Sequence, residues 1–299
     1  MAKNEPLKRY FYEIELMRKN TNPNLKDIKF YLENRGVNVS TRTIERDIEQ
    51  IRQNFGVVVM YDTQERSYYI DEDTSPNLQS FIRFLELANT AELFLTGIKK
   101  TKDFIKDIEF DSLSGLMGTE HLGLLLNAIQ SKLKINFTHI SYWSDKISDV
   151  ILAPYFLKEY QGRWYVVGLR DDDEIRTYGI DRISNLEITK ESFKKTKDAK
   201  ARANFDSIIG LIYSSEKQEK VVLSFKPQQG RYVKSLPWHH SQKILIDNEE
   251  ELRISLFVVP NFELFQKILM NGADVVVMEP EWLKDEIKKK ITAALKRYS

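Results

Sequence analysis

The chain has 299 residues and no cysteine, and its 45 lysines and arginines against 44 aspartates and glutamates give a formal net charge of +1. A single hydrophobic core rarely extends past about 250–300 residues, so two or three domains are expected. The lack of cysteine excludes disulfides, thiolate metal sites and a thiol nucleophile. Without a signal-peptide pattern or a long apolar run, we expect a cytoplasmic protein that does not enter a membrane. The adjacent His239 and His240 cannot form a helical i, i+4 metal pair, so no metal or cofactor is expected.

Residues 1–75 have the pattern of three helices followed by a hairpin. Apolar residues at helical spacing predict helices over 6–19 and 25–35, and Gly36 is the expected stop of the second. The later segment VVVMYDTQERSYYI contains two β-rich runs around a polar turn. Three helices and a hairpin predict a winged helix-turn-helix domain.

The third helix carries the residues that point to a function. It is expected to start at Ser40 or Thr41, because either hydroxyl can cap it. Its buried stripe consists of Ile44, Ile48, Ile51 and Phe55. Its opposite face is polar and carries Arg42, Thr43, Arg46, Gln50 and Gln53. A helix in the major groove presents its N-terminal turns to the bases, where arginine can pair with guanine. We therefore expect Arg42 and Arg46 to contact bases and Gln50 to contact DNA.

Contacts to the DNA backbone are expected around this helix. Ser40, Thr41 and Thr43 lie where hydroxyls and backbone N–H groups can meet a phosphate. Arg66, in the hairpin, can approach the backbone or the minor groove. Residues 1–54 hold 11 basic and 8 acidic residues, a net charge of +3, which partly supports DNA as the partner.

A helical protein-interaction module is the alternative interpretation of this segment. The carboxylates Glu45, Asp47 and Glu49 lie among the arginines and count against DNA. We expect these carboxylates to orient the arginines or to face other helices. The stretch VSTRTIERDIEQIRQNFGVVV, with its S-x-R-T-I-x-R-D-I pattern, resembles the recognition helix and wing start of DeoR-like winged helices that precede WYL domains. The resemblance implies DNA binding.

Residues 76–133 predict a helical bridge. Apolar residues such as Phe81, Phe84, Leu85 and Leu93 suggest one or two helices, and a break before a restart near Glu120 follows. We expect this segment to pack between domains, and a dimer contact or a signal-transmitting element is the alternative.

Residues 134–195 contain strand-like runs at short intervals without intervening helices, which predicts a small antiparallel barrel or sandwich. If the strands stay regular, alternation places Arg176, Tyr178 and Arg182 on one side of the fourth strand. The candidate ligand-contacting residues are His139, Ser141, Arg163, Tyr165, Arg176, Tyr178 and Arg182. Arginine forks match phosphate and aromatic faces stack on bases, so a nucleotide ligand is one interpretation. Structural ion pairs with Asp171, Asp181 or Glu159 are the other, and spacing alone leaves both open.

The segment RWYVVGLRDDDEIRTYGIDRISNLEI resembles the signature of a WYL domain. Trp164-Tyr165-Val166 stands where Trp-Tyr-Leu is usual, and Arg176 through Ile183 matches the R-x-[FY]-x-x-x-R-I stretch. The resemblance implies an Sm/SH3-like barrel that senses ligands in bacterial transcription factors, with nucleic-acid ligands in some members, and it favours the ligand interpretation. His139 stands where a tyrosine is frequent, so the fold carries over more safely than the ligand.

Residues 196–299 predict an α+β domain. The polar stretch over 193–206 suggests a linker or an exposed helix. Four strand-like runs and a helix over 262–270 give an alternation that suggests a ferredoxin-like sandwich. A terminal amphipathic helix follows, with its apolar stripe at Leu283, Ile287, Ile291 and Leu295. The region resembles the C-terminal extension that follows WYL domains.

Together these features predict an α+β multidomain protein with four segments: a winged helix over 1–75, a helical bridge over 76–133, a barrel over 134–195 and a ferredoxin-like extension over 196–299. We expect a homodimeric regulator that binds double-stranded operator DNA, responds to a nucleotide or nucleic-acid effector, and represses in preference to activating. No catalytic constellation is evident, so an enzyme is not expected. The alternative is a nucleotide- or nucleic-acid-binding accessory protein whose winged helix docks a protein partner.

Overall fold

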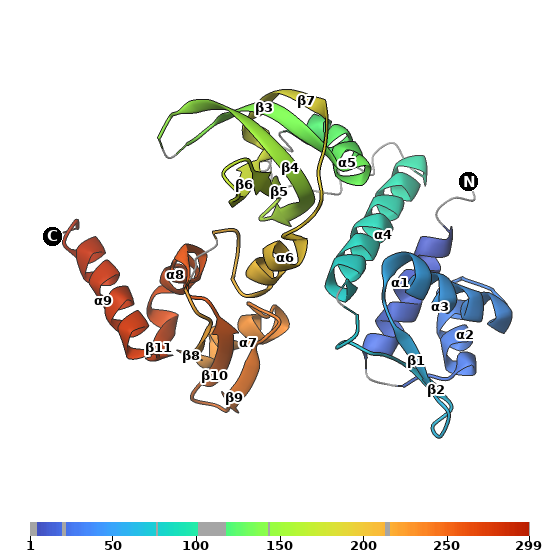
Figure 1. Ribbon diagram of the computed structural model, residues 1–299. Helices are drawn as coiled ribbons and strands as arrows, with labels where there is room; N and C mark the ends of the chain where they lie inside the picture. Colours follow the sequence, from blue (N-terminus) through green and yellow to red (C-terminus); the bar gives the residue numbers. More distant parts are fainter. Residues whose placement is uncertain are drawn as a thin grey trace. The chain divides into compact units, whose positions relative to one another are not determined.

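The structure is a computed structural model, and it describes residues 5–19, 22–75, 77–100, 118–142, 144–212 and 216–298. The chain divides into two compact units, Met1–Asp111 and Ser112–Ser299. Each unit is described by itself (Figure 1). No helix within the described ranges is long and apolar enough to span a bilayer.

Three helices build the first unit. They are α1 (Glu5–Arg18), α2 (Leu25–Glu33) and α3 (Thr41–Phe55), which confirms the three predicted helices. Their shared core is formed mainly by Tyr10, Ile14, Met17, Ile28, Leu32, Ile44, Ile48 and Ile51. The predicted stripe of α3 is therefore buried as expected, with Phe55 half-buried at its end.

Side-chain caps set the ends of α2 and α3. Asn24 accepts hydrogen bonds from the N–H groups of Lys26 and Asp27, and the Asp27 carboxylate accepts one from the Asn24 N–H in return. Ser40 caps α3 as predicted, because its Oγ accepts a hydrogen bond from the Thr43 N–H at 3.2 Å. α3 ends at Gly56, whose φ of 66° lies in the left-handed region that glycine adopts at little cost.

A two-stranded hairpin follows α3, as predicted. β1 (Val59–Asp62) pairs antiparallel with β2 (Ser67–Ile70), and it extends away from the three helices (Figure 1). Two hydrogen bonds tie it to them. Arg52 of α3 donates to the Val59 carbonyl at 2.7 Å, and the Tyr68 N–H donates to the Pro23 carbonyl at 2.8 Å.

The predicted bridge does not form one element. Its first part is α4 (Leu78–Lys100), which packs against α1 and completes the core of the first unit with Leu78, Phe81 and Leu85. Phe84 and Leu93, expected in the same apolar stripe, are exposed. The break expected before Glu120 falls on residues 101–117, which lie outside the described residues.

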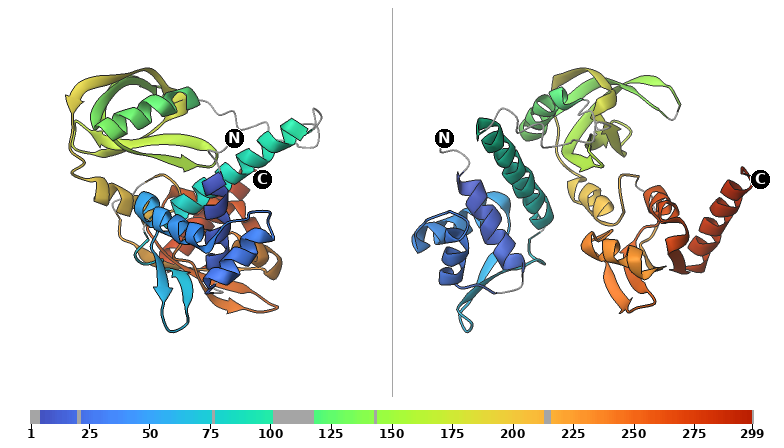
Figure 2. Two further views of the ribbon diagram at one scale, coloured as in Figure 1. Left: turned by 90° about the vertical axis from the view of Figure 1, so that its right-hand side faces the viewer. Right: turned by 180° about the vertical axis from the view of Figure 1, so that it is seen from behind.

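The second part of that segment belongs to the second unit. A 3-10 turn, η2 (Thr119–His121), leads into α5 (Leu122–Ser131). Five strands follow, which confirms the predicted run of strands: β3 (Leu133–Ile140), β4 (Ile147–Tyr160), β5 (Arg163–Arg170), β6 (Ile175–Gly179) and β7 (Ile183–Ser192). They form an antiparallel sheet in the order β6-β5-β4-β3-β7. The sheet is curled, as its green and yellow strands show in Figure 2. α5 buries Leu125 and Ala128 against this sheet, so the end of the predicted bridge is part of the core of the curled sheet.

A four-stranded antiparallel sheet forms the C-terminal part. Its strands are β8 (Glu219–Phe225), β9 (Lys243–Asp247), β10 (Leu252–Val258) and β11 (Val275–Glu279), in the order β11-β8-β10-β9. α7 (Pro227–Ser235) follows β8 and α8 (Phe262–Met270) follows β10, so the element order is the ferredoxin-like β-α-β-β-α-β. α7 was not predicted, because its nine residues, PQQGRYVKS, carry almost no apolar stripe.

Two further helices differ from expectation in part. The 3-10 turn η4 (Gly272–Asp274) precedes β11, and α9 (Glu281–Leu295) follows it. α9 buries Leu283 and Ile287 but leaves Ile291 and Leu295 exposed, so only the first half of the predicted stripe packs. α6 (Asp198–Asp206) forms within the stretch expected as a linker or an exposed helix, and it buries Ala201 and Phe205.

α6 and the loop after it join the curled sheet to the C-terminal sheet. Phe205 and Ile208 pack with Val167 of β5 on one side and Val259, directly after β10, on the other. The Val259 N–H also donates a hydrogen bond to the Ser207 carbonyl at 2.8 Å. These contacts place the start of α8 close to β5, which positions the cavity described next.

Candidate functional site

Fewer of the polar residues of α3 are exposed and unpaired than the sequence predicts. Arg42 and Arg46 are exposed, and neither has an acidic partner in the part of the chain that the structure describes. Thr41 is exposed beside them, while Thr43 is half-buried and its hydroxyl lies 3.0 Å from Ser40 Oγ. The first two turns of α3 therefore offer two unpaired guanidinium groups at a capped N-terminus.

Gln50 and Gln53 are engaged within the first unit. The Tyr10 hydroxyl donates to Gln50 Oε1 at 2.5 Å, and Gln53 donates to Glu49 Oε1 at 2.6 Å. Gln50, predicted to contact DNA, is half-buried and anchors α3 to α1. Arg66 is exposed at the last position of the hairpin turn, where its φ is 52°.

A buried ion pair fixes the position of α3. Asp47 is fully buried, and its carboxylate accepts two hydrogen bonds from the Arg9 guanidinium of α1. This agrees with the expectation that the carboxylates of α3 orient arginines or face other helices. Glu13 lies beside the pair, fully buried, and neither of its oxygens has a hydrogen-bond partner among the described residues. Burial, and next the Asp47 charge, raise the pKa of Glu13 well above its usual value.

Arg9 and Glu13 were not predicted from the sequence. The apolar periodicity of α1 rests on Leu7, Phe11, Ile14 and Met17, of which only Ile14 and Met17 are buried, and the other buried positions include 9, 10 and 13. The signal that could have found them is the spacing of Arg9 and Glu13, one turn apart and directly beside the apolar positions Tyr10 and Ile14.

In the second unit, the residues predicted to share one side of the fourth strand are separated at the end of β6. β6 stops at Gly179 and a 3-10 turn, η3 (Ile180–Arg182), follows, so the strand does not stay regular as far as Arg182. The expectation that Arg176, Tyr178 and Arg182 share one side is wrong for this reason. Arg176 and Tyr178 lie on the face of β6 opposite Thr177.

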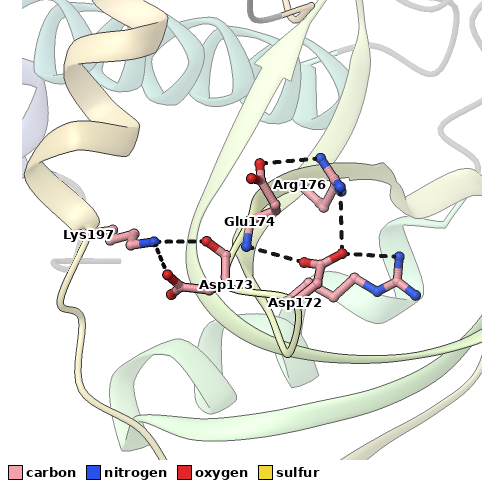
Figure 3. Close-up of polar contacts among 6 residues, drawn as sticks. Asp172, Asp173, Glu174, Arg176 and Lys197 are labelled. Carbon is pink, nitrogen blue, oxygen red and sulfur yellow. Dashed lines mark hydrogen bonds and ion pairs between the residues drawn. The ribbon is translucent and has the colours of Figure 1, made fainter. Parts of the chain in front are cut away.

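Arg176 belongs to an ion-pair network in the β5–β6 turn (Figure 3). Asp172 Oδ2 lies 3.5 Å from Arg176 and 3.7 Å from Arg170, and Glu174 Oε2 lies 3.7 Å from Arg176. Lys197 closes the same turn by donating to the carboxylate and the carbonyl of Asp173. The ion-pair interpretation left open by spacing therefore applies to Arg176, although its partners are Asp172 and Glu174.

Tyr178 and His139 contact each other within the curled sheet, and Ser141 makes a contact in the loop after β3. Tyr178 is buried, with its ring centroid 5.2 Å from that of Phe137 and 5.0 Å from that of His139. Burial, together with the Arg182 charge, lowers the pKa of His139. Ser141 is half-buried, and its Oγ accepts a hydrogen bond from the Ser144 hydroxyl at 3.2 Å.

The three remaining predicted residues, Arg163, Tyr165 and Arg182, line one cavity of about 480 Å³. This volume lies within the range of small-molecule sites. The residues that complete its lining were not predicted: Tyr160, Gln161, Thr177, Leu211, Ile212, Phe262, Glu263 and Gln266. Three of them come from α8 and two, Leu211 and Ile212, from the loop before β8, and no local sequence signal places these five beside β5.

The cavity is cationic but partly neutralised. Asp181 lies 3.3 Å from Arg163 and 3.4 Å from Arg182, so one carboxylate serves two guanidinium groups. Arg182 also stacks over the ring of Tyr142 at 4.7 Å. Burial raises the pKa of Tyr165, and the charges of Arg182 and Arg163 oppose this rise, so the phenol keeps its proton and can donate a hydrogen bond. No group of three His, Asp or Glu side chains within the described ranges could hold a metal ion.

Two family models match the second unit. Residues 120–188 match the WYL domain, and residues 217–295 match the WCX domain. Proteins named PafB from Mycobacterium tuberculosis and Mycobacterium bovis are 25% identical over 185 residues, which covers 61% of this chain and 55% of the relative. The chain thus matches about half the length of these curated relatives.

Two solved structures are also similar. Proteasome accessory factor B/C (PafBC) of Arthrobacter aurescens has 18% identity and a TM-score of 0.32, with 97% of this chain and 46% of that chain covered. A crystal structure of a CRISPR Cas-related protein has 15% identity and a TM-score of 0.40, with 98% of this chain and 85% of that chain covered.

The residues that line the cavity belong to the two matched domains and to the loop between them. The chain therefore contains a WYL domain followed by a WCX domain.

Proposed function

We propose that the chain is a DNA-binding transcriptional regulator whose first unit is a winged helix. The observation that carries this proposal is the pair of exposed arginines, Arg42 and Arg46, on the first turns of α3. The buried pair between Arg9 and Asp47 holds this helix rigidly, which favours readout of a fixed surface. Arg66 in the hairpin and Thr41 beside the helix cap supply phosphate contacts.

The protein acts on DNA as a homodimer in this proposal. One recognition helix reads only a few base pairs, and two half-sites gain affinity through effective concentration. The cavity lined by Arg163, Tyr165 and Arg182 holds a nucleotide or nucleic-acid effector, and its occupancy changes operator affinity. By linkage, DNA changes effector affinity by the same factor. Repression is favoured over activation.

The test is a comparison of two arginine variants on a duplex recovered by selection from a random pool. Arg46→Ala removes the proposed base contact, and Arg83→Ala removes an exposed arginine of α4 that pairs with Glu86. We expect Arg46→Ala to weaken binding about 10- to 100-fold and to relax base preference at one position, and Arg83→Ala to have little effect. Undiminished affinity and unchanged base preference of Arg46→Ala at matched salt would refute the assignment.

A further inference from the structure

Two residues that line the cavity, one from each domain, carry a buried polar atom that lacks a hydrogen bond within the described ranges. Arg182 Nε, on the WYL side, contacts Asp181 only as an ion pair at 3.4 Å. Glu263 Oε2, at the start of α8 in the WCX domain, has no hydrogen-bond partner among the described residues, and the Glu263 residue is only 7% exposed. One atom is a donor and the other an acceptor. Buried polar groups are usually paired, so a cavity with both kinds left over suits a ligand that supplies both complements.

Glu263 is held in place by its other oxygen. Oε1 accepts hydrogen bonds from the N–H groups of Leu211 and Ile212 at 3.0 and 2.9 Å. Gly210 allows this close approach, because a Cβ at that position would lie 2.6 Å from Glu263 Cγ. The carboxylate therefore cannot rotate freely to satisfy Oε2 elsewhere, and Oε2 is an unpaired acceptor of fixed position among the described residues.

The other residues of the lining and the volume of the cavity indicate the kind and size of the ligand. Tyr160, Tyr165 and Phe262 offer aromatic surfaces for stacking, and about 480 Å³ exceeds what a free amino acid or phosphate ion needs. We propose that the cavity binds a nucleotide through its phosphate at Arg163 and Arg182 and through an exocyclic amino group that donates to Glu263 Oε2. This inference rests on the effector part of the proposed function and adds a selection rule. A base with a carbonyl in place of the amino group would bring two acceptors together and bind weakly.

The experiment uses calorimetric titration of the full chain with two probes. Adenosine 5′-monophosphate carries the amino group, and purine riboside 5′-monophosphate lacks it but is otherwise the same molecule. We expect the native protein to bind the adenosine probe about 10- to 100-fold more tightly than the purine riboside probe, the range of one charge-assisted hydrogen bond. This comparison needs no variant, so it does not depend on the folding of a mutant.

Glu263→Gln supplies the second arm. The amide oxygen of glutamine can keep both backbone hydrogen bonds, while its NH₂ group replaces the acceptor by a donor. We expect this variant to bind both probes alike, and Glu187→Gln, an exposed change on β7, to keep the native preference. Equal binding of the two probes by the native protein, or no binding of the adenosine probe, would overturn the inference. Selective DNA binding is measured separately, so either result leaves the DNA-binding proposal standing or falling by its own test.

Discussion

At the scale of the residue, Glu13 is the side chain whose burial is least compensated. It is fully buried without a hydrogen-bond partner in the described part of the chain, next to the negatively charged Asp47. Burial raises the pKa of Glu13, so the folded state holds a proton on this group that the unfolded state releases. Stability contributed by that proton is fully present below the unfolded pKa and is lost as the pH rises through the folded pKa.

Glu13→Gln should therefore stabilise the protein in a pH-dependent way. Below the ordinary pKa of about 4.5 the two proteins should unfold alike, because Glu13 is neutral in both states. Above it the variant should become more stable, by about 1–3 kcal/mol near pH 8, since it never buries a charge. Urea unfolding of both proteins across this pH range checks the sign. Glu33→Gln, an exposed change on α2, should show no such trend, and a Glu13→Gln protein less stable than the native one at pH 8 would contradict the account.

The availability of some candidate site residues could be predicted from the sequence, and that of others could not. The exposure of Arg42 and Arg46 follows from helical periodicity, which needs only local information. The tethering of Gln50 by Tyr10 and the loss of Arg176 to Asp172 do not, because each depends on a partner whose approach is set by packing or by turn geometry. Residue type was enough to identify all of these side chains as candidates for ligand contacts. Their contacts in the folded protein decide which of them are free to bind a ligand.

At the scale of the element, α3 depends on its buried link to α1. Asp47→Ala leaves the Arg9 guanidinium buried without its partner, so it should cost about 3–5 kcal/mol of unfolding free energy. Replacing both residues, as Arg9→Met with Asp47→Leu, should recover most of that loss, because no uncompensated charge remains. Chemical denaturation of the native protein and the single and double variants forms the test. A double variant no more stable than Asp47→Ala would show that the pair itself, and not the orphaned charge, holds the helix.

Most helices and strands were predicted from the sequence, but one face assignment and one short helix were not. The helices and strands with strong periodicity formed as expected, including the ferredoxin-like order of the C-terminal sheet. The face assignment on β6 failed because one 3-10 turn after Gly179 changes the direction of Arg182. α7 was missed because its short helix buries only Gly230 and Val233. Register and short helices are set by tertiary contacts that a single sequence does not display.

At the scale of the whole molecule, the cavity is a product of the tertiary fold. Arg163 and Arg182 come from one domain and Phe262 and Glu263 from the other, about 80–100 positions apart in the chain. No motif joins these positions, so the sequence could supply only the WYL side of the site. A ligand that touches both walls links the two domains, which is what an effector needs in order to act on the rest of the molecule.

Arg163→Ala tests whether the ligand binds in this cavity or on the face of the sheet that carries Arg176. The Arg163 guanidinium is largely exposed, so its removal should change stability by less than about 1 kcal/mol. It should weaken the binding of adenosine 5′-monophosphate about tenfold or more, since a phosphate contact is lost. Arg176→Ala is the matched control, because its guanidinium belongs to the β5–β6 turn. If calorimetry shows the opposite order of effects, the ligand lies on the other face of the sheet.

The proposed function depends above all on sequence-selective binding of DNA by the first unit. The most direct measurement is the affinity of the full chain for the selected duplex and for a random duplex of equal length, by fluorescence anisotropy across a salt series. We expect much tighter binding to the selected duplex and a log–log salt slope of about −5 or steeper, as for a dimer that contacts several phosphates. Equal, weak binding to both duplexes with a shallow slope would contradict the claim and identify the helical unit as a protein-docking module.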